Sequence, residues 1–182
     1  NSAKILANAE IADLTLALGC GTRKDCDPDN LRYERIIIMT DADVDGAHIA
    51  TLLMTLFFQE MPEMVRQGHL YLARPPLYRL TAGGKSVYAQ DEKERREIEN
   101  GIFKGKKLEI GRFKGLGEMN PGQLKETTMD PKKRTMSRVE IPEMDENLTS
   151  TTVDQLMGNK PEARFKFIQE NAEFAEGEML DV

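Results

Sequence analysis

Arg35-Ile36-Ile37-Ile38-Met39-Thr40-Asp41-Ala42-Asp43-Val44-Asp45-Gly46 is the stretch that predicts the fold of this chain. Its first half is a continuous β-branched run, which is typical of a short strand buried on both faces. An acidic loop follows, and then a helix whose apolar residues recur on one face until Pro62: Ile49, Leu52, Leu53, Leu56 and Phe57. Residues 69–73 predict a second strand. Strand, loop, helix and strand in this order form a βαβ unit, so we expect a parallel sheet.

The remaining segments surround this unit. Residues 5–18 predict a helix that ends at Gly19, and residues 19–32 predict a polar loop. Further along the chain the patterns predict a hairpin of strands 77–80 and 86–89 joined across Gly83-Gly84, a charged helix over 91–100, a glycine-punctuated loop over 110–120, a strand over 135–141 and helices over about 150–157 and 161–175. The expected fold class is therefore α/β, with a parallel-sheet core and a small β-hairpin insert over residues 1–142 and a helical carboxyl-terminal tail over residues 143–182.

The composition is that of a folded domain. The 182 residues are 40% hydrophobic and 31% charged, which excludes a chain that is disordered throughout. The longest apolar segment is interrupted by Thr51, Thr55, Gln59 and Glu60, so no segment is expected to span a membrane. The sequence begins at Asn1 without an initiator Met or a signal-peptide pattern, so we expect a piece of a larger protein.

Cys20 and Cys26 are the only cysteines of the sequence. A zinc site would need further ligands, and the two histidines, His48 and His69, stand at the wrong spacing for a zinc finger. We therefore expect two reduced thiols beside a turn.

Charge is distributed unevenly along the chain. The net charge of −6 argues against a general nucleic-acid-binding domain. Residues 103–138, however, carry ten basic and four acidic side chains, whereas residues 139–182 carry three basic and eleven acidic ones. This pattern indicates either a local contact with a polyanion or a solvated charged face, and both interpretations stay open here.

Asp41, Asp43 and Asp45 stand at alternate positions directly after the predicted strand. Carboxylates this close repel one another, and a divalent cation such as Mg²⁺ relieves that repulsion. The alternative is that such aspartates only cap the following helix. Asp-x-Asp-x-Asp-Gly also begins an EF-hand loop, but position 12 of that loop needs a glutamate and is occupied here by Leu52.

Four blocks of the sequence, in the same order, resemble the TOPRIM domain of bacterial type IIA topoisomerase B subunits. They are Ile37-Ile38-Met39-Thr40-Asp41-Ala42-Asp43-Val44-Asp45-Gly46-Ala47-His48-Ile49, Pro75-Pro76-Leu77-Tyr78, Arg112-Phe113-Lys114-Gly115-Leu116-Gly117-Glu118-Met119-Asn120-Pro121 and Glu126-Thr127-Thr128-Met129-Asp130-Pro131. The resemblance implies a Rossmann-like TOPRIM core and extends into the tail near Phe167-Ile168-Gln169-Glu170-Asn171.

The resemblance implies an isomerase subunit that takes part in ATP-dependent DNA cleavage and religation, and so in relaxation, decatenation and chromosome segregation. The partner A subunit supplies the attacking tyrosine, and the two subunits form an A2B2 heterotetramer in the bacterial cytoplasm, at the nucleoid. Mg²⁺ is the implied metal, with Mn²⁺ or Ca²⁺ as substitutes. The resemblance makes Asp41 the ligand shared by two metal positions, Asp43 a ligand of the second and Asp45 a support. ATP would bind only to amino-terminal domains that this sequence does not contain.

Other residues of the family correspond to positions outside the acidic loop. The resemblance and the local sequence make Asn1, His48, Arg112, Lys114 and Arg164 candidate DNA contacts, although a histidine at a helix start can also be a cap. Glu10 lies near the place where quinolone-type inhibitors contact the family. The family's further catalytic glutamate stands in a Glu-Gly-Asp-Ser block that this sequence lacks, so we expect the 182 residues alone not to cleave DNA.

Alternative functions remain at this point. The short segment between Asp91 and Arg112 and the stretch Ile49-Ala50-Thr51-Leu52-Leu53 favour topoisomerase IV over DNA gyrase, and a gyrase without the long insertion stays open. A metal-binding scaffold module without catalytic activity is the alternative from another class. The second and third blocks argue against TOPRIM primases and nucleases.

Overall fold

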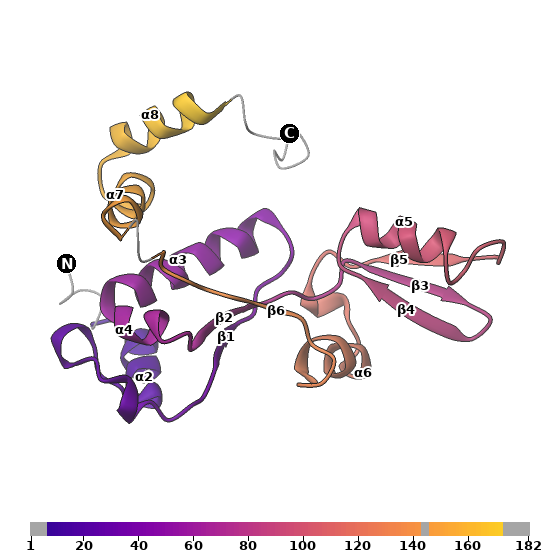
Figure 1. Cartoon of the computed structure of the whole chain (residues 1–182), viewed down its shortest axis with the longest axis horizontal. Coiled ribbons are helices and arrows are strands. Elements are labelled where there is room, and N and C mark those ends of the chain that lie inside the picture. Colours follow the sequence, from indigo (N-terminus) through magenta and orange to yellow (C-terminus); the bar gives the residue numbers. More distant parts are fainter. Residues whose placement is uncertain (1–6, 143–145, 173–182) are drawn as a thin grey trace. The chain divides into compact units, whose positions relative to one another are not determined.

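The computed structural model describes residues 7–142 and 146–172, and the chain folds into two compact units (Figure 1). The first unit combines Asn1–Ile36, Thr51–Leu70 and Val139–Val182, and the second combines Ile37–Ala50 and Tyr71–Arg138. Helix α3 (Val44–Glu60) contributes residues to both units.

The first unit begins with helix α2 (Ala9–Leu18). Its first turn is capped by Asn8, whose Oδ1 accepts the Ile11 N–H at 3.1 Å. The helix ends at Gly19, as predicted, and this glycine has the left-handed φ of 77° that favours glycine there. The expected loop over 19–32 contains two short 3₁₀ helices, η1 (Arg23–Asp25) and η2 (Pro28–Asn30).

An ion pair joins this loop to the end of α3. The Arg23 Nε and a terminal nitrogen of its guanidinium donate to the two carboxylate oxygens of Glu60, each at 2.8 Å. Glu60 is only 2% exposed, and a buried carboxylate without a cationic partner is strongly destabilising. Arg23 has a φ of 55°, uncommon for a residue with a side chain, so the ion pair accompanies an unusual backbone conformation.

Cys26 is half-buried beside Cys20, and both thiols are free. Burial, with a smaller contribution from Cys20, raises the pKa of the Cys26 thiol from 9.0 to about 11. Since the thiolate is the reactive form, we expect iodoacetamide to alkylate Cys26 in the folded chain, with Cys20 retained, about 100-fold more slowly at pH 8 than in the urea-unfolded chain, the modified thiol being identified by peptide mass. The rate should keep rising tenfold per pH unit to about pH 10. A rate that levels off near pH 9 would contradict the raised pKa.

The predicted helix that starts in the acidic loop is α3, and Pro62 begins a separate short helix, α4 (Pro62–Arg66). The expected apolar face of α3 is only partly buried. Phe57 is 2% exposed, but Ile49 and Leu52 are 51% and 48% exposed. Helical periodicity predicts which residues share a face, and not how far along the helix another element covers that face. Helices α7 (Glu146–Met157) and α8 (Pro161–Asn171) correspond to the expected tail helices.

A three-stranded sheet has the order β1-β2-β6, with bounds Ile36–Ile38, Leu70–Ala73 and Met136–Arg138. Strand β6 runs antiparallel to β2, with Tyr71 opposite Arg138, so the sheet is not parallel throughout as expected. Ile38 is the one residue of β1 that is fully buried.

Of the helices in the described part of the chain, none combines the length and apolar character that crossing a membrane requires.

The second unit contains a further antiparallel sheet of order β4-β3-β5, with bounds Lys85–Ala89, Tyr78–Ala82 and Glu109–Arg112. The predicted hairpin is confirmed, and Gly83 and Gly84 at its turn both have positive φ, which a tight hairpin turn requires. Strand β5 corrects the sequence prediction, because residues 110–112 were expected in a loop. Their pairing partner, β3, is about 30 residues away in the sequence.

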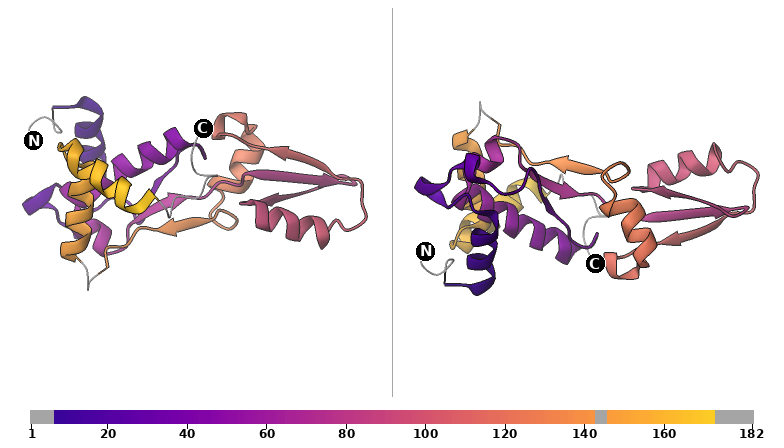
Figure 2. Two further views of the ribbon diagram at one scale, coloured as in Figure 1. Left: turned by 90° about the horizontal axis from the view of Figure 1, so that it is seen from above. Right: turned by 90° about the horizontal axis from the view of Figure 1, so that it is seen from below.

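Helix α5 (Glu92–Asn100) covers this sheet in both views of Figure 2. It starts, as predicted, after Asp91, whose Oδ1 accepts the Glu94 N–H at 2.8 Å. The helix packs on the sheet through a small buried core: Leu80, Ala82, Ala89, Ile98 and Phe103. After β5 the chain continues through η3 (Leu116–Glu118), α6 (Pro121–Leu124) and a π-helical turn, η4 (Lys125–Met129).

Candidate functional site

The acidic loop connects β1 to α3, and all three of its aspartates are exposed. Asp43 Oδ1 accepts the Gly46 N–H at 2.7 Å, and the Asp43 carbonyl accepts the Ala47 N–H at 3.0 Å. Asp43 therefore caps α3, and Asp45 lies in the first turn of that helix. The capping interpretation thus accounts for one oxygen of one of the three carboxylates.

Asp41 is held by a segment far away in the sequence. Its Oδ1 accepts the backbone N–H of Leu116 at 2.7 Å, a bond that joins residues 75 positions apart. The carboxylate also lies directly against Gly115, where an added Cβ would stand 2.8 Å from Asp41 Cγ. The backbone of Gly115 is extended, with a φ of −163°, so this position needs a glycine for the close approach of Asp41 and not for an unusual dihedral angle.

Gly46 makes a second close approach to Asp41. A Cβ at this position would stand 2.1 Å from the Asp41 carbonyl oxygen and 2.8 Å from its carbonyl carbon. Both are backbone atoms, which cannot rotate away as the end of a side chain can. The acidic loop therefore folds back on the first turn of α3, and only glycine allows this.

Three of the four sequence blocks meet beside the acidic loop. The Phe113 N–H donates to the Leu77 carbonyl at 2.8 Å, which joins the Pro-Pro-Leu-Tyr block to the Phe-Lys-Gly-Leu-Gly segment. A small hollow there is lined by residues of all three blocks: Ala42, Pro75, Pro76, Phe113, Gly115, Leu116 and Met119. The local structure thus brings together segments that are separate in the sequence.

The oxygen ligands of the loop fit a hard divalent metal. Mg²⁺ usually takes one or two protein carboxylates and keeps several waters. Asp41 and Asp43 each accept one backbone N–H through a single carboxylate oxygen, and these bonds fix the direction of both carboxylates. Within residues 7–142 and 146–172, no three His, Cys, Asp or Glu side chains are grouped so that they could hold a metal.

His48, Arg112 and Lys114 belong to the same unit as the acidic loop. His48 is exposed on α3, one turn after Asp45. Arg112 is exposed at the end of β5, with its guanidinium carbon 6.0 Å from the centre of the Tyr78 ring. Lys114 is also exposed, and its backbone N–H donates to Glu118 Oε2 at 2.8 Å. The three basic side chains are therefore accessible to a ligand.

The other predicted residues lie elsewhere. Glu10 and Arg164 belong to the first unit, and Asn1 is outside the described residues. Glu10 is exposed in the first turn of α2. Arg164 donates to the carbonyl oxygens of Leu156, at 2.6 Å, and Gly158, at 3.1 Å, so its guanidinium binds one carbonyl in the last turn of α7 and one just after the helix.

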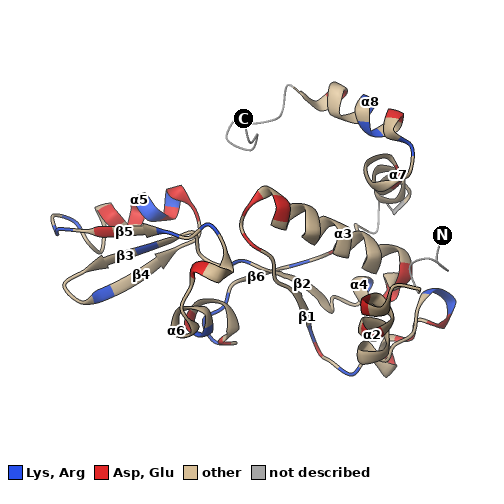
Figure 3. Ribbon diagram, turned by 180° about the vertical axis from the view of Figure 1, so that it is seen from behind, with Lys and Arg blue, Asp and Glu red and all other residues tan. Residues whose placement is uncertain are grey.

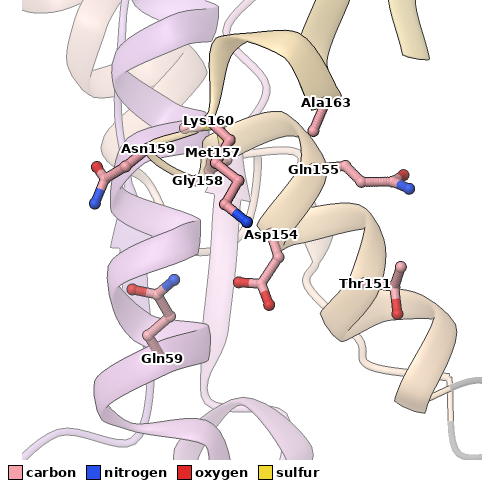
Figure 4. A pocket seen from close by; sticks show the side chains of 9 residues that line it. All are labelled: Gln59, Thr151, Asp154, Gln155, Met157, Gly158, Asn159, Lys160 and Ala163. Atoms are coloured by element: carbon pink, nitrogen blue, oxygen red, sulfur yellow. The ribbon is translucent and has the colours of Figure 1, made fainter. Parts of the chain in front are cut away.

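A larger open pocket, of about 750 Å³, belongs to the first unit (Figure 4). It is lined by residues of α3, α7, α8 and the turn between the last two, and most of them are polar, among them Gln59, Asp154 and Lys160. None of the residues of the acidic loop lines it. Its size alone therefore does not make it the functional site.

Sequence reasoning missed the residues that position Asp41. The Leu116 N–H, Gly115 and Gly46 all act through the backbone, so no side-chain type marks them. The available signal was the spacing of glycines in Phe113-Lys114-Gly115-Leu116-Gly117. The structure shows that Gly115 contacts the Asp41 carboxylate.

Two family models match this chain. The Toprim domain matches residues 3–75, and the family described as "DNA gyrase B subunit, carboxyl terminus" matches residues 105–169. The matched ranges contain the two segments that meet at Asp41, the acidic loop and the Gly115–Leu116 segment.

Individual relatives agree with these matches. The chain is 61% identical over 97% of its length to the DNA topoisomerase 4 B subunit of Caulobacter vibrioides, and 62% identical over 94% to that of Bartonella bacilliformis. It is 48% identical over 93% of its length to the DNA gyrase B subunit of Thermotoga maritima. The chain spans about a quarter of the length of these relatives, 25% of the first two and 26% of the third.

Proposed function

Since this chain belongs to the B-subunit family of bacterial type IIA topoisomerases, we propose that it is the part of such a subunit that binds a divalent metal at the site of DNA cleavage. The family match and the position of the acidic loop both support this proposal. The complete activity would be ATP-dependent strand passage, with ATP bound by other parts of the subunit and the nucleophilic tyrosine supplied by an A subunit in an A2B2 assembly.

The observation that carries the proposal is the fixed carboxylate of Asp41. One of its oxygens is bonded to the Leu116 N–H, and Gly115 and Gly46 pack against it without a Cβ. A carboxylate on a flexible loop would lose conformational freedom when it binds a metal, whereas this one is already oriented. The same contact joins a residue of the Toprim match to a residue of the gyrase B carboxyl-terminal match, which supports the proposal of one shared site.

Mg²⁺ is the metal that we propose, with Mn²⁺ or Ca²⁺ as substitutes, because the ligands are carboxylate oxygens. Asp41 and Asp43 would hold it, and Asp45 would support it from the first turn of α3. The bound metal would stabilise negative charge that develops at the phosphodiester and at the leaving oxygen. The protein's own contribution is to orient the two carboxylates before DNA arrives.

DNA contacts complete the proposed site. Arg112, Lys114 and His48 are exposed in the unit that holds Asp41, and they would bind the phosphates next to the cleaved bond. Asn1 and Arg164 remain proposed contacts as well, although Arg164 already binds two carbonyls at the end of α7.

Glu10 is the residue that we propose to lie near a bound quinolone-type inhibitor. We also propose residues 1–142 as the TOPRIM part and 143–182 as the tail.

The test is DNA cleavage by a complete B subunit that carries these residues, assembled with its A subunit. We expect Mg²⁺-dependent double-strand breaks whose 5′ ends are linked to protein, and no breaks when EDTA removes the metal. Decatenation of linked circles without net supercoiling would assign the enzyme to the topoisomerase 4 group named by the relatives above.

A different result would favour the scaffold alternative. If the assembled enzyme makes no breaks at any Mg²⁺ concentration, while the 182-residue chain binds Mn²⁺ tightly without DNA, the acidic loop is a metal site of another kind. The cleavage proposal expects weak binding until a phosphate joins the ligands, because Mg²⁺ sites of this type are completed by the substrate.

A further inference from the structure

Four lysines gather at one end of the β4-β3-β5 sheet, which we call the lysine end: Lys85, Lys104, Lys106 and Lys107. The strand register shows why they are neighbours. Thr81 of β3 stands opposite Ser86 of β4 on one side and Glu109 of β5 on the other. Lys85 and the segment that precedes β5 therefore lie about 10 Å apart, the width of two strand spacings. Figure 3 shows basic residues at this hairpin turn and in the loop between α5 and β5.

The lysine end has more positive charge than its surroundings neutralise. All four lysines are exposed, and within the described residues none of them makes an ion pair with an acidic side chain. The two arginines of α5 differ, because Arg95 and Arg96 pair with glutamates of their own helix. Glu109 is the single acidic residue in the segment 101–109.

Glycines form the turns at this end. Gly83, Gly84 and Gly105 all have positive φ, and a Cβ built on any of them would meet no atom within 4 Å. No neighbouring atom fills the space beside these three positions.

Strand β5 connects the lysine end to the metal site proposed above. It runs from Glu109 to Arg112, the chain continues to Lys114, and Leu116 then binds Asp41. Nine residues separate Lys107 from Leu116, and even a fully extended chain would cover only about 30 Å. Since a DNA base-pair step rises about 3.4 Å, Lys107 is within roughly nine base pairs of the proposed metal site.

We propose that the lysine end binds the phosphate backbone of the DNA duplex outside the cleaved base pairs, an inference that rests on the proposed function. Basic side chains stand at both ends of β5, and the negative charge of a DNA duplex continues past the cleavage site, so one duplex could contact both ends. A short acidic protein segment would contact only one end, so the duplex is the favoured partner. The contact carries no sequence information, because lysines bind phosphates as point charges.

The test uses the assembled enzyme and compares Lys106→Gln with Lys93→Gln, an exposed lysine of α5 outside the lysine end. Binding is measured from low to high salt on a duplex with arms of about twenty base pairs and on one with arms shorter than about five. Each phosphate contact that is removed should make the plot of log affinity against log salt less steep by about 0.9. We expect this change for Lys106→Gln and no change for Lys93→Gln. A variant with all four lysines changed to glutamine should lose at least about two in slope on the long duplex and nothing on the short one.

Two outcomes would overturn the inference. An unchanged slope on the long duplex would show that the lysine end does not bind DNA phosphates. An equal loss on both duplexes would mean that the substitutions act at the cleavage site or on the fold, which thermal unfolding of the variant would report. Mg²⁺-dependent cleavage should stay the same in Lys93→Gln. Failure of the cleavage proposal itself is therefore seen separately, in the unsubstituted enzyme.

Discussion

Asp41→Asn is expected to abolish metal-dependent DNA cleavage by the assembled enzyme while leaving the fold intact. The amide keeps an oxygen that can accept the Leu116 N–H, so the shape of the site is preserved and the negative charge is lost. Loss of a metal's stabilisation of the reacting phosphate removes roughly 4 kcal/mol, which corresponds to about a 1,000-fold lower cleavage rate. Cleavage would be measured as double-strand breaks at several Mg²⁺ concentrations.

Two further measurements separate this effect from unfolding. The melting temperature of Asp41→Asn should equal or exceed that of the unsubstituted protein, because one of three neighbouring like charges is removed. Mn²⁺ affinity in the presence of DNA should fall. Normal cleavage by Asp41→Asn would refute the assignment of this residue, whatever happens to stability.

Gly46→Ala is expected to produce the second largest loss, through geometry alone. Its methyl group would stand 2.1 Å from the Asp41 carbonyl oxygen, so the backbone of the acidic loop must move. A shift of about 1 Å at a catalytic group can lower a rate roughly 100-fold, and overpacking typically costs about 1–3 kcal/mol of stability. Cleavage rate and urea denaturation of the same preparation would measure the two effects.

Gly117→Ala is the matched control. A Cβ at Gly117 would meet no atom within 4 Å, and its φ is outside the left-handed region. This variant should keep full cleavage activity and change stability by less than about 0.5 kcal/mol. If Gly46→Ala behaves like Gly117→Ala, the acidic loop is not held as tightly as the structure indicates.

Part of the fold could be predicted because its signals are local. The end of α2 at Gly19, the hairpin turn at Gly83-Gly84 and the start of α5 after Asp91 all depend on residues within one turn. The candidate metal residues were also marked locally, by three aspartates between a β-branched run and a helix. The four sequence blocks identified the family in the same way, and the family models agree.

Other features could not be predicted from neighbours in the sequence. Strand β5 exists because residues 109–112 pair with β3, although their glycine suggested a loop. The partial exposure of α3 depends on which elements reach its surface, and the burial of Glu60 depends on an arginine 37 residues earlier. Propensity and periodicity describe a segment by itself, whereas burial and strand pairing depend on the segment that packs against it.

The sequence by itself therefore determined the order of most elements, the acidic loop and the family. Only the tertiary structure decided how the site is built. It showed that Leu116 and Gly115 hold Asp41, that Asp43 also caps α3, and that four lysines share one end of a sheet. The physical reason is the same in each case: these contacts join backbone groups or strands that are distant in the chain, and their free energy depends on a geometry that exists only after folding.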